Sequence, residues 1–600
     1  MSQQVFASLV DMQRRSCAAH GNRPLFGTKR GGVYQWMTYG EFGAEVDRCR
    51  AALGALGVGR GDRVSVIANN RVEWAVGAYG TYSLGGTYVP MYEAQLAKDW
   101  KYILRDSGAK VLLVSSEAIY DEVKDFPAEI ETLEHVLCFD APASASASFA
   151  AALAKAAPMD PVMPVAEDIC GFIYTSGTTG EPKGVVLSHG NIISNVNAVQ
   201  QEFPIREDDC SLSFLPWAHS FGQTCELHTL MSRGAAIGLA ESVQTLIDNF
   251  SEVKPTLLFS VPRIFNRIYD GLQKRMEDES PVKRALFYKG LEVARERRLL
   301  ADKGQKSWWV DKQYAFFDKL VFSKVRARFG GRLQYAFSGG AALSKEVALF
   351  IDDIGIEVYE GYGLTETSPI ATANTPGARR IGSIGKPLPG IEVVICDEQG
   401  KRVPAGQEGE IVVIGPNVMQ GYHNRPEATE EVIFDLDGKR AFKTGDMGSI
   451  DPDGFVRITG RFKEQYKLEN GKYVVPSPLE ELLKLSGFVN QVFLYGDNKP
   501  YNVAIVVPDF EAVQKWAKKQ GLSASTPEDL VKDKAVHAKI GEELRKYGDA
   551  FKGYERPQRW ALITDEFSTE NDMMTPSLKI KRRVVQRVYQ AMLDGLYHDA

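Results

Sequence analysis

The sequence lacks the cysteine spacing of a metal or disulfide site. Its seven cysteines are odd in number, lie far apart along 600 residues and never form a CxxC pair. This pattern excludes a disulfide framework or a cysteine-based zinc site as the organising feature, and it fits a reducing cytoplasm. We therefore expect most of the cysteines to be small buried side chains.

A long hydrophobic run is also missing. The first fifteen residues mix acidic and basic side chains, which excludes a secretory signal. The longest uncharged stretch near the front, between Glu73 and Glu93, contains several glycines and a proline. It predicts a core helix followed by a strand rather than a membrane span. We expect a cytoplasmic protein, and a peripheral contact with a membrane stays open.

An excess of positive charge is absent as well. The chain has 71 Lys and Arg against 77 Asp and Glu, with a net charge of -6 and a pI near 5.9. This balance argues against nucleic acid as a partner. The 44% hydrophobic content is ordinary for a globular protein, and 600 residues exceed one core, so at least two domains are expected.

Apolar runs of strand length alternate with helix-length periodic stretches through most of the first 460 residues. This alternation predicts an α/β fold with parallel sheets covered by helices. A charged helical pattern at about 267–331 indicates a helical insertion. The clearest strand candidates are VSVIAN (64–69), VLLVSS (111–116), ICGFIYTS (169–176) and LQYAFSGG (333–340).

A smaller α+β domain is predicted after about residue 461. Ser477 and Glu480 have the spacing of a capping box at the start of a helix. Residues 491–507 predict two strands around a Gly/Asn/Pro turn, and ALIT at 561–564 predicts another strand.

The strongest chemical signal is YTSGTTGEPKG at 174–184, directly after an apolar strand. Glycines let backbone N–H groups approach a polyphosphate, hydroxyls donate to its oxygens, and a lysine offsets its charge. A Walker A loop is excluded, because GxxxxGK[ST] is absent. The predicted phosphate-binding residues are Thr175, Ser176, Gly177, Thr178, Thr179, Gly180 and Lys183.

This string resembles the phosphate-binding signature of the adenylate-forming superfamily, which includes acyl-CoA synthetases, firefly luciferase and peptide-synthetase adenylation domains. TYGEF (38–42) and GRGDRVSV (59–66) extend the resemblance to the front of the chain, so it covers nearly the whole length. The other family motifs follow in order, as GGA (339–341), YEGYGLTE (359–366), TGD (444–446), GRFKEQYK (460–467) and TPSLKIKRR (575–583).

The resemblance implies a nucleotide site. Tyr362 would stack on adenine, Asp446 would accept from the ribose hydroxyls, and Thr175 with Glu366 would bind Mg²⁺. The further residues implied to bind ATP or AMP are Gly339, Gly340, Ala341, Gly361, Gly363, Thr365 and Arg461.

The resemblance also implies catalytic residues, namely Lys579, Lys183 and Glu366. Lys579 would stabilise charge on the carboxylate and α-phosphate oxygens, while Lys183 and magnesium would hold the departing pyrophosphate. The implied product is an acyl adenylate, which the thiol of CoA then attacks. Without the resemblance, a lysine in a basic run is more often a solvated surface charge.

The implied architecture is a large multi-subdomain N-terminal domain and a small α+β C-terminal domain. The predicted boundaries are 1–460, a hinge linker at 461–464, and a mobile C-terminal domain at 465–600. Lys463 stands at the hinge position of the family. In the family the C-terminal domain rotates between the two half-reactions.

Two departures from the family pattern point to its long-chain branch. Leu578 stands where many members have glycine before the catalytic lysine, and Glu464 stands where many have aspartate. Tyr473 lies at the position of the aromatic gate to the fatty-acid tunnel. His219, in LPWAHSFG (215–222), is implied to lie near the substrate carboxylate.

The expected activity is therefore that of a long-chain fatty acid–CoA ligase, with fatty acid, ATP and CoA as substrates and Mg²⁺ as cofactor. Three alternatives stay open: a fatty acyl-AMP ligase that delivers to a carrier protein, a luciferase-like monooxygenase, and a non-catalytic fatty-acid-binding relative. The intact Lys183, Glu366, Asp446 and Lys579 argue against the last of these. The sequence does not indicate an oligomeric state.

Overall fold

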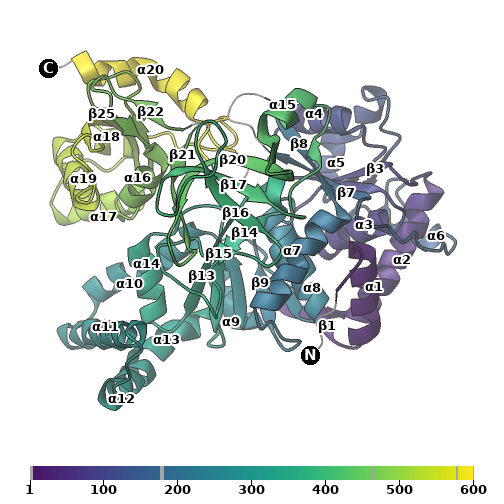
Figure 1. The fold of residues 1–600 in the computed structure, drawn as a ribbon, viewed down its shortest axis with the longest axis horizontal. Helices are drawn as coiled ribbons and strands as arrows, with labels where there is room; N and C mark the ends of the chain where they lie inside the picture. The colour runs from purple at the N-terminus through teal and green to yellow at the C-terminus, as the bar shows by residue number, and fades with distance from the viewer. Residues whose placement is uncertain (1–4, 176–180, 243, 463, 576–578, 599–600) are drawn as a thin grey trace. The chain divides into compact units, whose positions relative to one another are not determined.

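A computed structural model of the chain describes residues 5–175, 181–242, 244–462, 464–575 and 579–598. Figure 1 shows the course of the chain. It divides into two compact units. The first unit comprises Met1–Pro262, Glu279–Thr444 and Ser449–Arg457, and the second comprises Arg263–Asp278, Gly445–Gly448 and Ile458–Ala600.

The first unit is built around a seven-stranded sheet. Across the sheet its strands are β18 (Gly421–Tyr422), β8 (Lys183–Ser188), β7 (Ile169–Thr175), β4 (Thr87–Met91), β3 (Arg63–Ile67), β5 (Val111–Val114) and β6 (His135–Cys138). The pairs from β7 to β6 are parallel, whereas β8 is antiparallel to both of its neighbours.

The helices of the first unit mostly follow its strands in sequence, and η2 and η3 are π-helices. They are α1 (Leu9–His20), α2 (Tyr39–Ala55), α3 (Val72–Tyr82), α4 (Ala97–Ser107), α5 (Glu117–Val123), η1 (Phe126–Ala128), α6 (Phe149–Lys155), α7 (His189–Glu202), η2 (Phe221–His228), α8 (Thr229–Arg233), α9 (Leu246–Val253), α11 (Pro281–Asp302), α12 (Trp308–Phe317), η3 (Asp318–Phe322), α13 (Ser323–Arg326), η4 (Ala327–Phe329), α14 (Lys345–Asp353), η5 (Thr365–Thr367) and α15 (Pro426–Val432).

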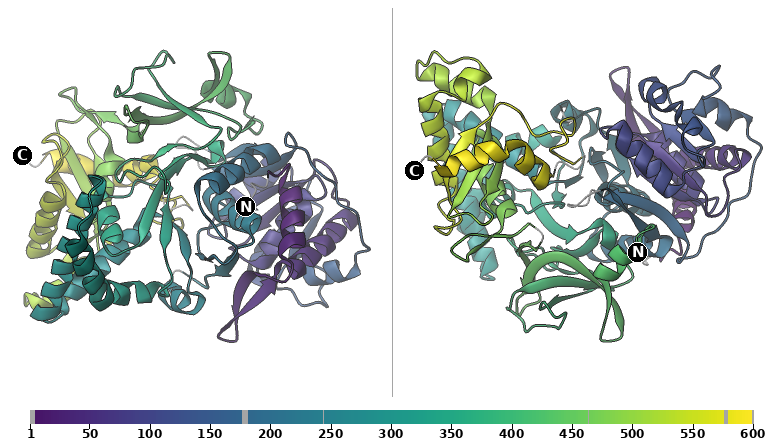
Figure 2. Two further views of the ribbon diagram at one scale, coloured as in Figure 1. Left: turned by 60° about the horizontal axis from the view of Figure 1, so that its bottom comes forward. Right: turned by 90° about the horizontal axis from the view of Figure 1, so that it is seen from above.

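Both faces of the seven-stranded sheet are covered, because the side chains of its strands alternate between two cores. Leu113 of β5 lies in the core that contains Trp74 of α3, whereas Leu112 lies in the core that contains Trp100 of α4. Figure 2 shows helices on both faces of this sheet. The predicted α/β class with helix-covered sheets is therefore confirmed.

Three further sheets involve residues of the first unit. The four-stranded sheet has the order β2 (Val33–Thr38), β1 (Pro24–Arg30), β10 (Ala236–Leu239), β9 (Cys210–Ser213). One five-stranded sheet has the order β11 (Leu257–Ser260), β12 (Tyr335–Ser338), β13 (Glu357–Gly363), β14 (Ile370–Ala373), β15 (Lys386–Pro387). The other contains β16 (Glu392–Cys396), β17 (Gly409–Ile414), β20 (Lys439–Ile450) and β19 (Ile433–Leu436), with β21 (Val456–Arg461) beside β20.

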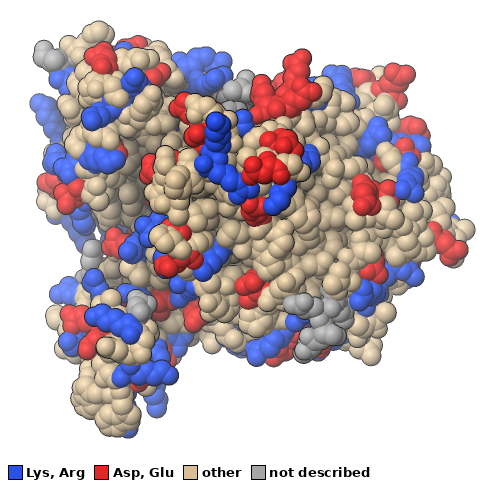
Figure 3. All heavy atoms as spheres, in the orientation of Figure 1, with Lys and Arg blue, Asp and Glu red and all other residues tan. Residues whose placement is uncertain are grey.

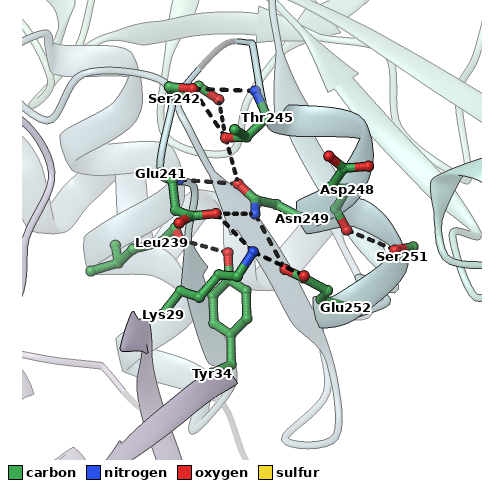
Figure 4. Close-up of polar contacts among 10 residues, drawn as sticks. All are labelled: Lys29, Tyr34, Leu239, Glu241, Ser242, Thr245, Asp248, Asn249, Ser251 and Glu252. Atoms are coloured by element: carbon green, nitrogen blue, oxygen red, sulfur yellow. Dashed lines mark hydrogen bonds and ion pairs between the residues drawn. The ribbon is translucent and has the colours of Figure 1, made fainter. Parts of the chain in front are cut away.

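A polar network fastens the four-stranded sheet to α9 (Figure 4). Lys29 of β1 places its Nζ 3.0 Å from Glu241 and 2.9 Å from Glu252. Asn249 donates to Glu241 at 2.9 Å, so each carboxylate has a partner. The network joins β1 to the segment after β10 and to α9, and β9, which pairs with β10, leads into the segment that contains His219.

The second unit is a small α+β domain. Its three-stranded sheet has the order β24 (Val489–Tyr495), β25 (Asn502–Pro508), β26 (Pro557–Leu562), and β22 (Tyr466–Lys467) pairs with β23 (Tyr473–Val474). Its helices are α10 (Pro262–Asp278, from Arg263 on), α16 (Pro476–Leu483), α17 (Phe510–Lys519), α18 (Pro527–Leu530), α19 (Lys534–Tyr547) and α20 (Arg582–His598). Leu494 packs in one core and Phe493 in the other, so both faces of the sheet are buried.

Two local predictions for the second unit are wrong in detail. The capping box does not form, because Glu480 binds Arg582 at 2.8 and 2.9 Å and accepts from the backbone N–H of Leu494. Ser477 donates instead to Glu464, and α16 begins at Pro476, two residues before the start that a cap at Ser477 predicts. The strand predicted at 561–564 is β26, which already ends at Leu562.

Candidate functional site

The two arms of the glycine-rich loop form an antiparallel hairpin. β7 ends at Thr175, β8 begins at Lys183, and these two residues are directly paired. Directly paired side chains lie on the same face of a hairpin, so a hydroxyl and an ammonium group stand side by side at its end. The predicted phosphate ligands Ser176, Gly177, Thr178, Thr179 and Gly180 lie outside the described residues.

A tyrosine that sequence reasoning missed connects Lys183 with Glu366. The Nζ of Lys183 lies 5.0 Å from the ring centroid of Tyr422, and the Tyr422 hydroxyl donates to Glu366 Oε1 at 2.8 Å. Tyr422 is in place because β18 pairs with β8, with Tyr422 opposite Val185. Burial, and then the Glu366 carboxylate, raise the pKa of Tyr422, so its hydroxyl remains a donor.

The oxygen donors at this site suit magnesium. This ion is usually held by one or two carboxylates, while substrate phosphates and waters complete its octahedron. Glu366 supplies a side-chain carboxylate, and Thr175 supplies a hydroxyl. The backbone of Glu366 is held in place, because its carbonyl accepts from the N–H of Met419 at 2.8 Å. Over the described ranges, no group of three or more His, Cys, Asp or Glu residues could hold a metal by itself. Binding of the ion would therefore depend on the nucleotide.

β13 carries the residues predicted to contact adenine. Tyr362 is 8% exposed and pairs with Thr372 of β14. Only glycine fits at Gly363, because a Cβ there would lie 1.8 Å from the carbonyl oxygen of Pro369. At Gly361 a Cβ would make an ordinary contact of 3.4 Å. The backbone of the motif is therefore closely packed around Tyr362.

The GGA segment follows directly after β12. Gly340 has a φ of 80°, in the left-handed region that favours glycine. A Cβ at Gly339 would lie 3.2 Å from the ring of Phe221, so this loop packs against the π-helix η2. Ala341, the third residue of the segment, is exposed. The adenine motif and the predicted acyl-site segment are thus in contact.

His219 lies in the turn before η2. Its Nδ1 accepts from the backbone N–H of Phe221 at 3.2 Å, so a neutral ring carries its proton on Nε2. The neighbouring Ser220 hydroxyl lies 3.2 Å from that of Thr365. The segment predicted to meet the substrate carboxylate therefore adjoins the adenine motif, and an N–H donor suits a carboxylate.

Glu226 is a second residue that sequence reasoning missed. It is fully buried in η2, where its carboxylate accepts from Ser211 at 2.7 Å and from Ser213 at 2.5 Å. Burial raises the pKa of Glu226 to about 7. These contacts join η2 to β9 and fix the turn at His219. The only sequence signal is an acid without a basic neighbour, which is too weak to predict the role.

The second unit contains the predicted ribose residue. Asp446 is almost completely buried, and its Oδ1 lies 2.7 Å from Nε of Arg461. The N–H of Phe462 donates to the carbonyl of Gly445 at 3.0 Å, so this turn and the start of the predicted linker are held together. Arg461 also lies 3.8 Å from Glu464. The predicted hinge residue Lys463 lies outside the described residues.

Lys579 also lies in the second unit. Two hydrogen bonds join it to Thr575, one from each backbone N–H, at 2.8 and 3.1 Å. The next basic residues have structural partners, since Lys581 binds Asp572 at 2.5 Å and Arg582 binds the buried Glu480. They anchor the chain directly after Lys579, whose side chain is exposed. Leu578 lies outside the described residues.

Tyr473, predicted as the gate, lies on the short β22–β23 hairpin of the second unit. It is 56% exposed and pairs with Lys467, whose Nζ lies 5.5 Å from the tyrosine ring. The contact is a cation–π pair at the surface of the hairpin. The gate role stays a prediction.

The structure thus brings one group of predicted residues together in the first unit. Lys183 and Glu366 meet through Tyr422, while Thr365 meets the segment of His219. A bilayer-spanning helix would need a long apolar run, and none of the described helices has one.

The fold is that of adenylating enzymes. The solved structure of the adenylation domain of a carboxylate reductase from Mycobacterium chelonae matches with a TM-score of 0.79 at 22% identity, over 99% of this chain and 91% of that one. The sequence shows the family as well as the fold. The chain belongs to the AMP-binding enzyme family, whose model matches residues 13–423, and the model of the AMP-binding enzyme C-terminal domain matches residues 463–600.

Relatives within this family span nearly the whole chain. A long-chain-fatty-acid–CoA ligase of Mycobacterium bovis is 30% identical over 583 residues, which cover 94% of this chain and 93% of that protein. The peroxisomal long-chain acyl-CoA synthetase 7 of Arabidopsis thaliana is 32% identical over 590 residues, covering 94% and 82%. The predicted family is therefore confirmed.

Proposed function

We propose that this protein is an ATP-dependent long-chain fatty acid–CoA ligase. The carboxylate of the fatty acid attacks the α-phosphate of ATP to give acyl-AMP and pyrophosphate. The thiol of CoA then attacks the acyl carbon and loses its proton, AMP leaves, and acyl-CoA forms. One observation carries the proposal: the Lys183–Tyr422–Glu366 connection stands beside a glycine-rich hairpin in a chain that aligns over 94% of its length with a long-chain-fatty-acid–CoA ligase.

In the first unit, different residues of the proposed nucleotide site bind different parts of ATP. Lys183 and the loop Ser176–Gly180 bind the phosphates, while Gly339, Gly340, Ala341 and the β13 motif enclose the adenine. Magnesium, held by Glu366 and Thr175, would neutralise phosphate charge when bound. Tyr422 would restrict the orientation of the Glu366 carboxylate, because its hydroxyl donates to Oε1.

In the second unit, we assign Asp446 to the ribose hydroxyls, with Arg461 as the cation that orients its carboxylate. We assign Lys579 to the carboxylate and α-phosphate oxygens during adenylation, where a positive charge offsets the repulsion between two anions. The proposed domain boundaries remain 1–460, 461–464 and 465–600, with Lys463 as the hinge.

The acyl group is assigned to the segment around His219, and Tyr473 to the entrance of its tunnel. The Nε2–H of a neutral His219 ring would donate to the substrate carboxylate, because Nδ1 is already occupied by the Phe221 N–H. Glu226 would keep this segment in place without touching substrate.

A product assay tests the proposal. Purified protein is given ATP, Mg²⁺ and palmitate, with and without CoA, and pyrophosphate, AMP and acyl-CoA are quantified by mass spectrometry. We expect acyl-CoA and AMP in equal amounts, with turnover that depends on the thiol. Adenylate that accumulates without thioester would favour the carrier-dependent alternative, and binding of palmitate without pyrophosphate release would contradict the enzyme assignment.

A further inference from the structure

Helix α12 exposes aromatic side chains that the fold does not use. Trp308 and Trp309 are 69% and 63% exposed, and Phe316 is 59% exposed. The opposite side of the helix holds it in place, since Val310 and Phe317 are buried. Two adjacent tryptophans, of eight in the chain, therefore face solvent on a helix that is already anchored.

These side chains form one stripe, which we call the α12 face: Trp308, Trp309, Lys312, Phe316, Lys319 and Leu320. Residues three and four apart lie on one side of a helix, so the spacing places the stripe on a single face that continues into η3. Lys312 lies over the ring of Trp308 at 4.7 Å. Figure 3 shows uncharged surface gathered over α12, at the lower left, with basic side chains next to it.

Around the α12 face, the charged side chains that form no ion pair in the described part of the chain are positive. Its acids are already paired, because Asp311 binds Arg297 at 2.8 Å and Asp318 binds Arg326 at 2.6 Å. Lys303, Lys306, Lys312 and Lys319 are exposed, and none forms an ion pair within the described part of the chain. The face is therefore aromatic with a border of uncompensated lysine.

From this chemistry we infer that the α12 face docks on the surface of an anionic phospholipid bilayer. Trp308 and Trp309 enter the headgroup region, where amphipathic indole rings partition best, and Phe316 buries its apolar ring at the boundary with the acyl chains. Lys306, Lys312 and Lys319 lie against lipid phosphates. The inference stands on this face alone and does not depend on the acyl chemistry proposed above.

A second copy of the chain is a poorer occupant of this face. A symmetric dimer through the α12 face would bring the same lysines against each other, with no acid on the face to compensate them. The aromatic side chains also stand on an exposed helix rather than in a groove, so they suit a soft planar surface better than a protein pocket.

Vesicle binding by the full chain tests the inference. Sedimentation is measured with vesicles of phosphatidylcholine alone and of phosphatidylcholine with phosphatidylglycerol, at low and high salt. We expect strong binding only to the anionic vesicles, weakened by salt. The double variant Trp308→Ala/Trp309→Ala and the double variant Lys306→Glu/Lys312→Glu should each lower the partition coefficient about tenfold or more.

Matched controls come from elsewhere on the surface. Trp36→Ala removes another exposed tryptophan of the first unit, and Lys518→Glu/Lys519→Glu makes the same charge change on α17. Both controls should bind like the unaltered chain, and all variants should keep its melting temperature. Lipids brominated in their acyl chains should quench tryptophan fluorescence in the unaltered chain and much less in the α12 tryptophan variant.

Three results would overturn the inference. One is a chain that does not sediment with anionic vesicles, and another is binding that both α12 variants retain. The third is a dimer that dissociates in the tryptophan variant while vesicles bind neither protein, which would make the face an interface between copies.

Discussion

Glu366 is the residue on which metal dependence rests in this account. In Glu366→Gln a neutral amide replaces the carboxylate that is proposed to hold Mg²⁺, and an amide is a poorer ligand for a hard dication. We expect a higher magnesium requirement and slower pyrophosphate exchange, by about 10-fold or more. A magnesium titration of exchange measures both, and an unchanged titration would show that another residue holds the metal.

Tyr422→Phe is the matched companion, because it keeps the ring beside Lys183 and removes only the hydroxyl that donates to Glu366. Its effect on the magnesium titration should lie between those of the unaltered chain and Glu366→Gln. An effect larger than that of Glu366→Gln would mean that the hydroxyl acts on something other than this carboxylate.

Lys579 is predicted to act in only one of the two half-reactions. Lys579→Ala should lower the rate of adenylate formation by about 10²–10³, or about 3–4 kcal/mol, because a transition-state charge contact is lost. Thioester formation from preformed acyl-AMP should persist. Arg583→Ala, an exposed basic residue four positions later, is the control and should leave both steps intact. Equal loss of both steps in Lys579→Ala would refute the assignment.

Glu360 is predicted to make the folded chain less stable as pH rises. Burial raises the pKa of this carboxyl from 4.5 to about 7 in the folded chain. Between these values the folded chain keeps a proton that the unfolded chain releases, so the free energy of unfolding falls as pH rises, by up to about 3 kcal/mol. Above pH of about 7 this contribution is constant.

Glu360→Gln removes this titration while its amide oxygen can still accept from the N–H of Leu343. The stability of the variant relative to the unaltered chain should therefore rise with pH across this window. Denaturant unfolding at several pH values measures it. Three other carboxyl groups also have raised pKa values, namely those of Glu226, Asp270 and Asp353. They make stability depend on pH in both proteins, so the quantity to compare is the difference in the free energy of unfolding between the variant and the unaltered chain. A constant difference would contradict the shifted pKa.

Some of these residues were predictable from sequence and others were not. Lys183, Glu366, Asp446 and Lys579 lie in motifs whose residue types carry the chemistry, so the string itself suggests them. Tyr422 has no such motif, because its role arises from the pairing of β18 with β8 and a contact with Glu366. Glu226 likewise owes its role to two serines on a strand that only the fold places beside it.

At the scale of elements, the backbone packs so closely where β13 meets β14 that no residue with a Cβ fits at Gly363. A Cβ would lie 1.8 Å from the carbonyl oxygen of Pro369, just before β14, and this oxygen already accepts from the backbone N–H of Leu364 at 3.1 Å. Gly363→Ala should lower the free energy of unfolding by about 3 kcal/mol or more. Denaturant unfolding measures this loss.

The control for Gly363→Ala is Gly377→Ala. Gly377 lies in the turn after β14, where a Cβ would meet no atom within 4 Å. This variant should change stability by less than about 0.5 kcal/mol. If the two variants were equally stable, the close approach at Gly363 would be disproved.

Elements were predicted well where local pattern decides and poorly where distant residues do. The apolar runs 64–69, 111–116 and 169–176 correspond to β3, β5 and β7 within about two residues, because a buried parallel strand is apolar on both faces. The capping box failed because Arg582, 102 positions away, takes the buried carboxylate of Glu480. Sequence spacing describes a helix start, but it does not show a competing partner.

At the scale of the whole molecule, the family was readable from the order of its motifs, because a resemblance from residue 174 to 583 constrains nearly the whole chain. The family models at 13–423 and 463–600 agree with that extent. The α12 face was not readable, since an aromatic pair in a helical pattern is more often core than surface. Only the packing of Val310 and Phe317 shows which side of the helix is left outside.

The central claim is that the chain joins long-chain fatty acids to CoA, and the chain-length dependence of kcat/KM for acyl-CoA formation tests it most directly. Each buried methylene contributes about 0.8 kcal/mol, so the rate should rise about fourfold per carbon until the acyl site is filled, with the optimum at about twelve carbons or more. Tyr473→Ala should flatten that rise and leave the magnesium and ATP dependence unchanged. An optimum at acetate or at an aromatic acid, or no acyl-CoA at any length, would contradict the account.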